Sequence, residues 1–503
     1  MNQPGIRNKN VLIITGVSPE TAEQFQYMGM VSDPIILLIS MSGKNSYQSS
    51  IPSLGAAALG GYLRQQGMPV TIADYFFDEV PFTDADIIGI SSTFMSFEDV
   101  KRIADESREK NPGATIVLGG PISWSVAPKE LMYNIPSLDH IVLQEGEQTF
   151  TQLIEAIRNR DDISLVPSVI SRYEGELRES GHGKPVDIDA IPMPAWDLMG
   201  TPSERRFPVL PIETSRGCPY HCAYCSEVSY WGKPVRYRSI ESVVEEIRYN
   251  ADKFGITTFR FADSCFSSPA ERCASVCDAI YEQCITRGVP VKWSSYARFE
   301  NISQELLDKM KRSGCVALDF GLESGSTEIL RDMGRGYAED RVVDVARRAR
   351  ELDIITNFNL VVGFPGETRE TVQDTIDLLN KAKPDTFTTF SFFVAPRTKA
   401  YSDHARYGLD GAGLSWKHDT MTSEGAAVAM RAVADGVTGA TSFPAGEYAA
   451  LYLTSVGYSS KEIRDFYKAT GRLVKGADDK ATIAYVKKVN DSVSHLCYRN
   501  YGV

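Results

Sequence analysis

The chain has 503 residues, of which 43% are hydrophobic, 23% charged and 10% aromatic, a composition typical of a globular protein of about three domains. Its formal net charge of -12, without a long basic run, disfavours nucleic acid as a partner. No stretch approaches the ~20 apolar residues of a membrane span, and the N-terminus lacks the apolar region of a signal peptide, so we expect a cytoplasmic protein without a membrane span.

The first 165 residues predict one domain in which strands and helices alternate. The expected strands are 11–14, 35–41, 70–74, 86–91, 114–120 and 140–143, and the expected helices lie near 54–62, 98–109 and 149–157. Apolar strands that alternate with helices predict a Rossmann-like, doubly wound parallel sheet, whose ligand lies beyond the carboxyl ends of the strands.

Residues 166–208 predict a connecting segment. A hairpin over 168–173 turns at Glu174–Gly175, and six prolines follow between Pro185 and Pro211. So many prolines exclude a continuous helix, so this stretch is predicted to be a linker.

Residues 209–399 resume the alternation and predict six strand–helix units. The expected strands are 209–214, 258–261, 291–295, 317–321, 356–361 and 386–392, and the helices lie near 241–253, 269–287, 303–313, 338–352 and 368–382. The sequence Ser268-Pro269-x-Glu271 predicts a capping box at the second helix. Six parallel units indicate a partial (βα)6 barrel with its function at the carboxyl ends of the strands.

Residues 400–503 predict a helical C-terminal domain. Ser459 and Glu462 predict a capping box, and Gly471 a stop. The region holds no chemical motif, and we expect it to act as a lid over the barrel mouth.

Three of the nine cysteines, Cys218, Cys222 and Cys225, fall within eight residues, and none occurs before Cys218. This clustering favours reduced thiols around a metal over a disulfide framework. Three thiolates would leave one iron of a cubane cluster open, whereas the same cysteines with His221 could form a structural zinc site. The zinc interpretation lacks the second, distant ligand pair of zinc ribbons.

The spacing Cys-x3-Cys-x2-Cys, with Tyr224 before the last cysteine, resembles the signature of the radical S-adenosylmethionine (SAM) enzymes. The resemblance implies a [4Fe-4S] cluster on the three cysteines and SAM on its open iron. It also implies an electron donor such as flavodoxin or ferredoxin, and reductive cleavage of SAM to methionine and a 5'-deoxyadenosyl radical.

Polar and glycine residues follow successive strands of the expected barrel, where a carboxylate can accept hydrogen bonds from SAM and a glycine allows close approach. Each of them alone also fits an ordinary cap or turn. With the resemblance, the expected SAM-binding residues are Tyr224, Asp263, Arg298, Glu323, Ser324, Asn359, Gly363 and Glu367.

The first domain resembles the B12-binding domain that precedes many radical SAM modules, in residues 51–63, 90–92, 117–121 and 144–147. The resemblance implies cobalamin, held by Ser91, Ser92, Gly119, Gly120 and Glu145. Gly119–Gly120 also fits a tight turn. The Asp-x-His-x-x-Gly motif that supplies a lower cobalt ligand is missing, and His140 is the first histidine.

These features together predict cobalamin-dependent methyl transfer to an unactivated carbon of a small molecule or natural product. A cobalamin-independent radical cyclisation or rearrangement is the alternative, which the missing histidine favours. An iron-sulfur electron carrier or a structural metal protein is a third reading, although an electron carrier needs four cysteines.

Of the other cysteines, Cys273, Cys277 and Cys284 share one helical stripe with Ile280 and are predicted to pack in the core. Cys265 lies near Asp263 at a strand end, and Cys315 and Cys497 have no assignment.

Overall fold

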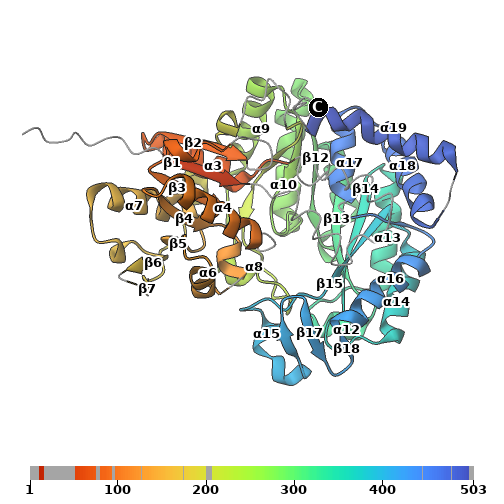
Figure 1. The fold of residues 1–503 in the computed structure, drawn as a ribbon. Coiled ribbons are helices and arrows are strands. Elements are labelled where there is room, and N and C mark those ends of the chain that lie inside the picture. Colours follow the sequence, from red (N-terminus) through yellow and green to blue (C-terminus); the bar gives the residue numbers. More distant parts are fainter. Residues whose placement is uncertain are drawn as a thin grey trace, which may run out of the picture. The chain divides into compact units, whose positions relative to one another are not determined.

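The computed structural model describes residues 11–15, 51–74, 80–92, 97–125, 127–173, 175–199, 207–444, 446–476 and 479–497 (Figure 1). Contacts within the chain define two compact units, one with residues 52–204 and the first strand, the other with residues 205–503. The strand expected at 35–41 lies outside the described residues.

The first unit is built on a seven-stranded sheet in the order β2-β1-β3-β4-β5-β6-β7. Strands β1 to β5 are parallel, and β6 and β7 continue the sheet as an antiparallel hairpin. The hairpin predicted within the linker therefore extends this sheet. The strands are β1 Val11–Thr15, β2 Val70–Asp74, β3 Ile87–Ser91, β4 Thr115–Gly119, β5 His140–Val142, β6 Val169–Tyr173 and β7 Glu176–Glu179.

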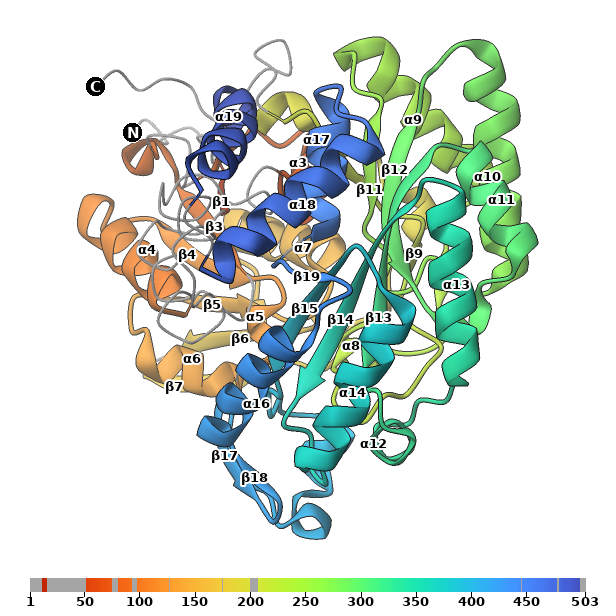
Figure 2. The ribbon, with the colours of Figure 1, turned by 90° about the vertical axis from the view of Figure 1, so that its right-hand side faces the viewer.

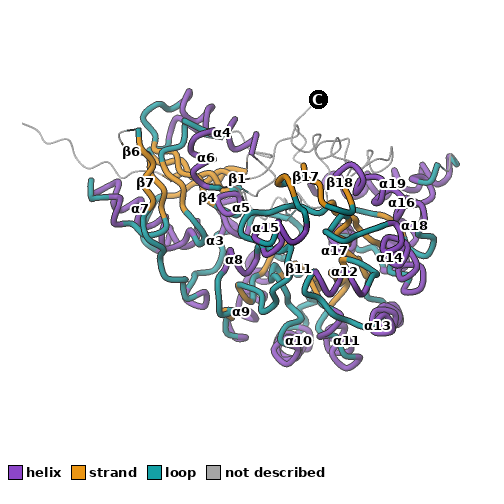
Figure 3. The backbone as a smooth tube through the Cα atoms, turned by 90° about the horizontal axis from the view of Figure 1, so that it is seen from below, coloured by secondary structure: helices purple, strands orange, loops and turns teal. Residues whose placement is uncertain are grey.

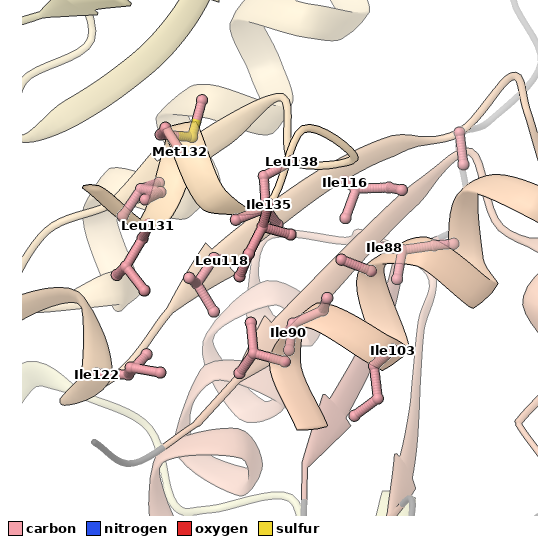
Figure 4. Close-up of a cluster of buried hydrophobic side chains, with 14 of the residues drawn as sticks. Ile88, Ile90, Ile103, Ile116, Leu118, Ile122, Leu131, Met132, Ile135 and Leu138 are labelled. Carbon is pink, nitrogen blue, oxygen red and sulfur yellow. The ribbon is translucent and has the colours of Figure 1, made fainter. Parts of the chain in front are cut away.

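Helices cover this sheet because its central strands are buried on both sides. The helices of the unit are α3 Leu54–Gln65, α4 Phe97–Lys110, α5 Ile122–Ser125, α6 Pro128–Asn134 and α7 Gly146–Asn159. Figure 4 shows side chains from β3, β4 and helices α4 to α6 meeting in one apolar core, including Ile90, Ile103, Leu118 and Leu131.

The second unit contains a parallel sheet in the order β19-β15-β14-β13-β12-β11-β8. Its strands are β8 Leu210–Ile212, β11 Thr258–Phe261, β12 Lys292–Ala297, β13 Cys315–Glu323, β14 Ile355–Val362, β15 Thr386–Ser391 and β19 Thr441–Ser442. The predicted partial barrel is thus confirmed, with β19 as an additional short strand.

Helices follow the barrel strands in sequence and lie along its outer side (Figure 3). They are α9 Ile240–Phe254, α10 Ala270–Gln283, α11 Gln304–Arg312, α13 Glu339–Glu351 and α14 Arg369–Ala382. The short helix α12 Thr327–Asp332 follows β13 at the mouth of the barrel instead, where Ile329 belongs to an apolar cluster with Phe364 and Trp416 (Figure 2). The capping box predicted at Ser268 is wrong: Pro269 is the N-cap of α10 and no side chain caps it.

The C-terminal region is mainly helical, with α15 Lys399–Ser402, α16 Ser423–Gly436, α17 Gly446–Ser455, α18 Ser460–Val474 and α19 Lys480–Cys497. The Ser459–Glu462 capping box is confirmed, whereas the stop predicted at Gly471 is wrong, because α18 continues to Val474. A small antiparallel sheet, which the sequence did not predict, is formed by β16 Asp410–Ala412, β17 Ser415–His418 and β18 Met421–Thr422.

These two parts of the C-terminal region lie at opposite ends of the barrel strands. Figure 2 shows β17 and β18 beyond the arrowheads of β14 and β15, while α17 to α19 lie toward the other end. Residues of α17 and α18 pack against Ala317 and Ile355, which lie near the starts of β13 and β14. Among the described residues of the C-terminal region, it is therefore the segment around β16–β18 that lies at the mouth that the lid was expected to cover.

Candidate functional site

The three clustered cysteines lie in a loop at the barrel mouth that is closed by a short antiparallel pair, β9 Ser215–Arg216 with β10 Arg236–Tyr237. The loop ends in helix α8, Glu227–Trp231. Its middle is held on both sides of Ala223, whose N–H donates to the Met333 carbonyl at 2.8 Å and whose carbonyl accepts from the Ala400 N–H at 2.8 Å. The backbone around the thiols is thus fixed by the surrounding protein.

The thiols themselves are adjacent without being gathered to a point. Within the described ranges, no three His, Cys, Asp or Glu side chains stand close enough together to hold a metal ion. Burial raises the pKa of Cys218 and Cys225, so that both stay protonated without a ligand and iron must displace those protons. Three thiols and no fourth protein ligand fit a cubane cluster with one open iron.

Asp263, at the end of β11, is joined to the residues that precede the loop. Its carboxylate accepts from the backbone N–H of Thr214 at 2.7 Å, from the Thr214 hydroxyl, and from the Ser215 hydroxyl at 2.8 Å. Asp263 is 2% exposed, and burial raises its pKa. Both of its oxygens are therefore occupied within the protein, which is a different use from the SAM contact that we predicted.

Arg298 reaches the cysteine loop from the end of β12. Its Nη1 lies 3.4 Å from the sulfur of Cys222, and its guanidinium stacks 3.7 Å from the ring centre of Tyr220. Nη2 pairs with Glu300 at 2.8 Å, while Nε is buried without a hydrogen-bond partner among the described residues. A buried cation beside a cysteine sulfur fits an anionic cluster or the carboxylate of SAM.

Glu323 and Tyr224 meet at Arg335, which the sequence did not indicate. Arg335 Nη1 lies 3.2 Å from Glu323 Oε1 and 3.5 Å from the Tyr224 hydroxyl, and Nη2 donates to the Gly321 carbonyl at 2.6 Å. Glu323 has a φ of +62°, which costs a non-glycine residue on the order of 1 kcal/mol. Such backbone strain at a buried carboxylate is typical of functional sites.

Ser324 and Asn359, also predicted to bind SAM, are engaged by the protein. The Ser324 hydroxyl accepts from the Ser326 N–H at 3.1 Å and lies 3.4 Å from the Thr375 hydroxyl. The Asn359 amide donates to Asp319 at 2.7 Å. Ser324 follows β13, whereas Asn359 lies within β14 and not at its end, and neither is part of the Glu323–Tyr224–Arg335 group.

The predicted nucleoside end of the SAM site is a tight turn from Gly363 to Glu367. Gly363 and Gly366 have φ values of +92° and +96°, and the Gly363 N–H donates to the Glu367 carboxylate. Glu367 is 2% exposed, and its burial raises its pKa to about 7. The turn is thus closed upon itself by one buried carboxylate.

A buried polar group on the inner side of the sheet was not predicted. The Arg260 guanidinium lies 4.2 Å from the ring centre of Tyr296 and 5.5 Å from that of Tyr448, and its Nε and Nη2 have no hydrogen-bond partner among the described residues. Burial, and then the charge of Asp319, raise the pKa of Glu447 well above its ordinary range, so that Glu447 is protonated and bonds to Asp319. The positive charge of Arg260 is then paired with the negative charge of Asp319.

In the first unit, the predicted cobalamin residues lie at neighbouring strand ends. The Ser92 N–H donates to the Gly119 carbonyl at 3.3 Å, and a Cβ at Gly120 would lie 2.7 Å from the Ser92 carbonyl oxygen. With a φ of +86°, Gly120 lets the loops after β3 and β4 meet. Ser91 precedes this contact, while the Glu145 carboxylate accepts from the Val186 N–H at 2.9 Å.

A Cβ at Gly119 would make ordinary van der Waals contact with Val142 on β5, 4.0 Å away, so packing among the described residues does not demand a glycine at this position. A glycine that packing does not require fits close approach of a ligand to the backbone. His140 is buried on β5, with Nδ1 2.9 Å from the Ser171 hydroxyl.

The cysteines predicted to pack in the core do so: Cys273, Cys277 and Cys284 are each no more than 1% exposed, as is Ile280. Cys265 is 5% exposed, and burial raises its pKa to about 12. Cys315 is likewise buried, and the side chain of Cys497 lies outside the described residues.

Across the described part of the chain, no helix combines the length and apolar character needed to cross a membrane.

Comparison with protein families matches both units. The model of the radical SAM superfamily matches residues 212–379, and that of the B12 binding domain matches residues 44–154. These two families bind a [4Fe-4S] cluster with SAM and cobalamin, respectively.

Curated relatives are similar to this chain over 62% to 76% of its length. A protein of Pyrococcus horikoshii described as an uncharacterized methyltransferase is 28% identical over 346 residues, 66% of this chain and 74% of that one. The cytidylyl-2-hydroxyethylphosphonate methyltransferase of Streptomyces wedmorensis is 28% identical over 62% of this chain and 64% of its own length. The anaerobic magnesium-protoporphyrin IX monomethyl ester cyclase of Synechocystis is 25% identical over 76% of this chain and 79% of its own length.

Solved structures share the fold. The radical SAM methyltransferase TsrM of Kitasatospora setae, with cobalamin and a [4Fe-4S] cluster bound, superposes with a TM-score of 0.63 at 17% identity over 96% of this chain and 100% of that one. The cobalamin-dependent SAM radical enzyme OxsB superposes with a TM-score of 0.64 at 16% identity over 97% of this chain and 76% of that one. With a cysteine loop at the mouth of a parallel barrel and a separate sheet that the B12-binding model matches, the chain combines a radical SAM domain with a preceding B12-binding domain.

Proposed function

We propose that this enzyme transfers a methyl group from cobalamin to an unactivated carbon of a small molecule. The observation that carries the proposal is the presence in one chain of two sites: the cysteine loop beside Arg298, and the paired strand ends at Ser92 and Gly120. Two of the relatives are named as methyltransferases, which supports it.

When bound, the cofactors would supply an electron that splits SAM into methionine and a 5'-deoxyadenosyl radical, and a methyl group on cobalt. The chain would supply three thiolates, a carboxylate at Glu323 for the ammonium of SAM, and the Gly363–Glu367 turn for the nucleoside. An external one-electron donor, such as a flavodoxin or ferredoxin, would reduce the cluster.

The inner side of the sheet supports an uncharged substrate. Tyr296 is 37% exposed although β12 lies between two neighbouring strands, and Phe390 on β15 is 39% exposed. Phe390 shares the face of Thr388, whose hydroxyl bonds inward to Asn357, because side chains alternate along a strand.

A cobalamin-independent cyclisation or rearrangement is the second candidate. One observation favours it: the sequence lacks the histidine motif for a lower cobalt ligand. The similarity to the Synechocystis cyclase covers more of this chain than the similarity to either methyltransferase.

The test is to express the protein with hydroxocobalamin, reconstitute its cluster without oxygen, and add dithionite with SAM that carries a deuterated methyl group. We expect bound cobalt, deuterated methylcobalamin and 5'-deoxyadenosine. Formation of 5'-deoxyadenosine without cobalt binding at saturating hydroxocobalamin would reject methyl transfer in favour of the second candidate. A full cluster that yields no 5'-deoxyadenosine would reject radical chemistry altogether.

A further inference from the structure

The segment from Val394 to Thr422, between β15 and α16, lies beyond the residues that match the radical SAM family. It includes α15, the three-stranded sheet β16–β18 and a short helix at His404–Tyr407. Figure 2 shows β17 and β18 at the end of the barrel toward which β14 and β15 point. The segment therefore stands where the SAM-binding turn was predicted.

The side chain of His418, at the end of β17, bonds to the backbone of this turn. Its Nε2 lies 3.0 Å from the Gly363 carbonyl oxygen, and its Nδ1 lies 3.3 Å from the Thr420 backbone N–H. A backbone N–H can only donate, so Nδ1 accepts and the ring proton resides on Nε2. His418 is thus a neutral side chain that donates to the Gly363 carbonyl, while Glu367 accepts from the Gly363 N–H.

Trp416 covers the same glycine. A Cβ at position 363 would lie 2.5 Å from the Cη2 atom of Trp416. The indole N–H donates to the Phe392 carbonyl at 2.7 Å, and the ring stacks on His418 with 5.1 Å between centres and 6° between planes. Its orientation is therefore determined at both ends, and it leaves room at position 363 only for glycine.

The segment also contacts the cysteine loop. The Ala400 N–H donates to the Ala223 carbonyl at 2.8 Å, one residue after Cys222. Ala223, Phe364, Phe392 and Trp416 belong to one apolar cluster. One segment thus holds both the loop that would bind the cluster and the turn that would bind the nucleoside.

We propose that Trp416 and His418 are positioning residues of the SAM site, holding the Gly363–Glu367 turn at a fixed place relative to the cysteine loop. The inference rests on the proposed function, since it takes this turn as the nucleoside site. SAM must be bound at both ends to align its sulfonium with the cluster, and a turn with two glycines at positive φ is not rigid alone. Preorganising the turn lowers the entropic cost of binding SAM.

The experiment compares two buried tryptophans that each donate to a backbone carbonyl: Trp416 to Phe392, and Trp293 on β12 to Ser313 at 3.0 Å. The variants Trp416→Phe and Trp293→Phe remove one such bond each. SAM affinity is measured by equilibrium dialysis on the anaerobic, cluster-loaded protein, together with iron content and melting temperature.

We expect Trp416→Phe to bind SAM about tenfold more weakly with its iron content unchanged, and Trp293→Phe to lower the melting temperature without changing SAM affinity. His418→Ala should weaken SAM binding about as much, and His418→Gln should restore part of it because glutamine keeps a donor for the Gly363 carbonyl.

Wild-type SAM affinity in both Trp416→Phe and His418→Ala would overturn the inference. If Trp416→Phe loses iron, its SAM affinity no longer reports on the turn, and the two His418 variants decide instead. Equal SAM affinity in His418→Ala and His418→Gln would then also overturn the inference. A wild-type protein with a full cluster that does not bind SAM contradicts the proposed function instead.

Discussion

The carboxylate of Asp263 accepts two hydrogen bonds from Thr214, one from its backbone N–H at 2.7 Å and one from its hydroxyl. The contact joins the end of β11 to the residue that follows β8 by two positions and precedes Cys218 by four. It sets where the cysteine loop leaves the barrel. Asp263, which the sequence predicted as a SAM ligand, thus has a structural role within the protein.

The variant Asp263→Ala tests whether Asp263 mainly holds the cysteine loop or mainly binds SAM. It leaves the Thr214 N–H buried without an acceptor, so we expect the free energy of unfolding in urea to fall by about 2 kcal/mol or more. Iron content after reconstitution should fall with it, because the loop is no longer held. A variant that keeps its iron and its stability but loses SAM affinity would restore the ligand role.

The cysteines offer an internal comparison. Cys222→Ala should abolish binding of a cubane cluster, measured as iron and sulfide per chain and by the visible absorption. Cys277→Ala, in the core of α10, should keep its iron and lose only stability, by about 1 kcal/mol or more. Iron loss in Cys277→Ala with retention in Cys222→Ala would place the cluster elsewhere.

Arg298 should raise the reduction potential of the cluster, since a cation 3.4 Å from the Cys222 sulfur favours the more negative, reduced state. We expect Arg298→Gln to lower the midpoint potential by roughly tens of millivolts. A redox titration followed by electron paramagnetic resonance measures it. Arg312→Gln, which removes an exposed cation paired with Asp278 at 2.8 Å, is the control and should leave the potential unchanged.

Glu367 makes stability depend on pH. Burial raises its pKa from 4.5 to about 7, so the folded state prefers the protonated form. Its contribution is complete below pH 4.5 and is lost as the pH rises through 7, by about 3 kcal/mol at ~1.4 kcal/mol per unit. Urea unfolding of wild type and Glu367→Gln between pH 4.5 and 8 should show the wild type losing stability relative to the variant. A relative gain with rising pH would contradict the assignment.

Gly363 and Gly366 separate steric contact from backbone strain. Both have φ above +90°, but a Cβ at 363 would lie 2.5 Å from Trp416, whereas one at 366 would have Ile329 at an ordinary 3.5 Å. Gly366→Ala should cost about 1 kcal/mol of strain, and Gly363→Ala clearly more. Equal losses of stability in the two variants, measured by thermal or urea unfolding, would mean that Trp416 moves aside without an energetic cost.

Local patterns in the sequence determined most of the secondary structure. The run Thr258–Phe261 was predicted with its observed bounds, because a short run of β-branched and aromatic residues between turn residues favours a strand. The capping box at Ser459 formed as expected, because its partners are three residues apart. At Ser268 the same pattern failed, and the hydroxyl lies instead 3.5 Å from that of Tyr220.

Only the tertiary structure decided how the mouth of the barrel is built. Gly363 and His418 are 55 positions apart, Asp263 and Thr214 are 49, and Arg335 is 111 from Tyr224. A motif records residue types at fixed spacing within one loop or helix, and side chains that meet through separate strands leave no such spacing. The sequence by itself therefore determined which cysteines and which strands carry the chemistry. Only the tertiary structure decided which residues hold them in place.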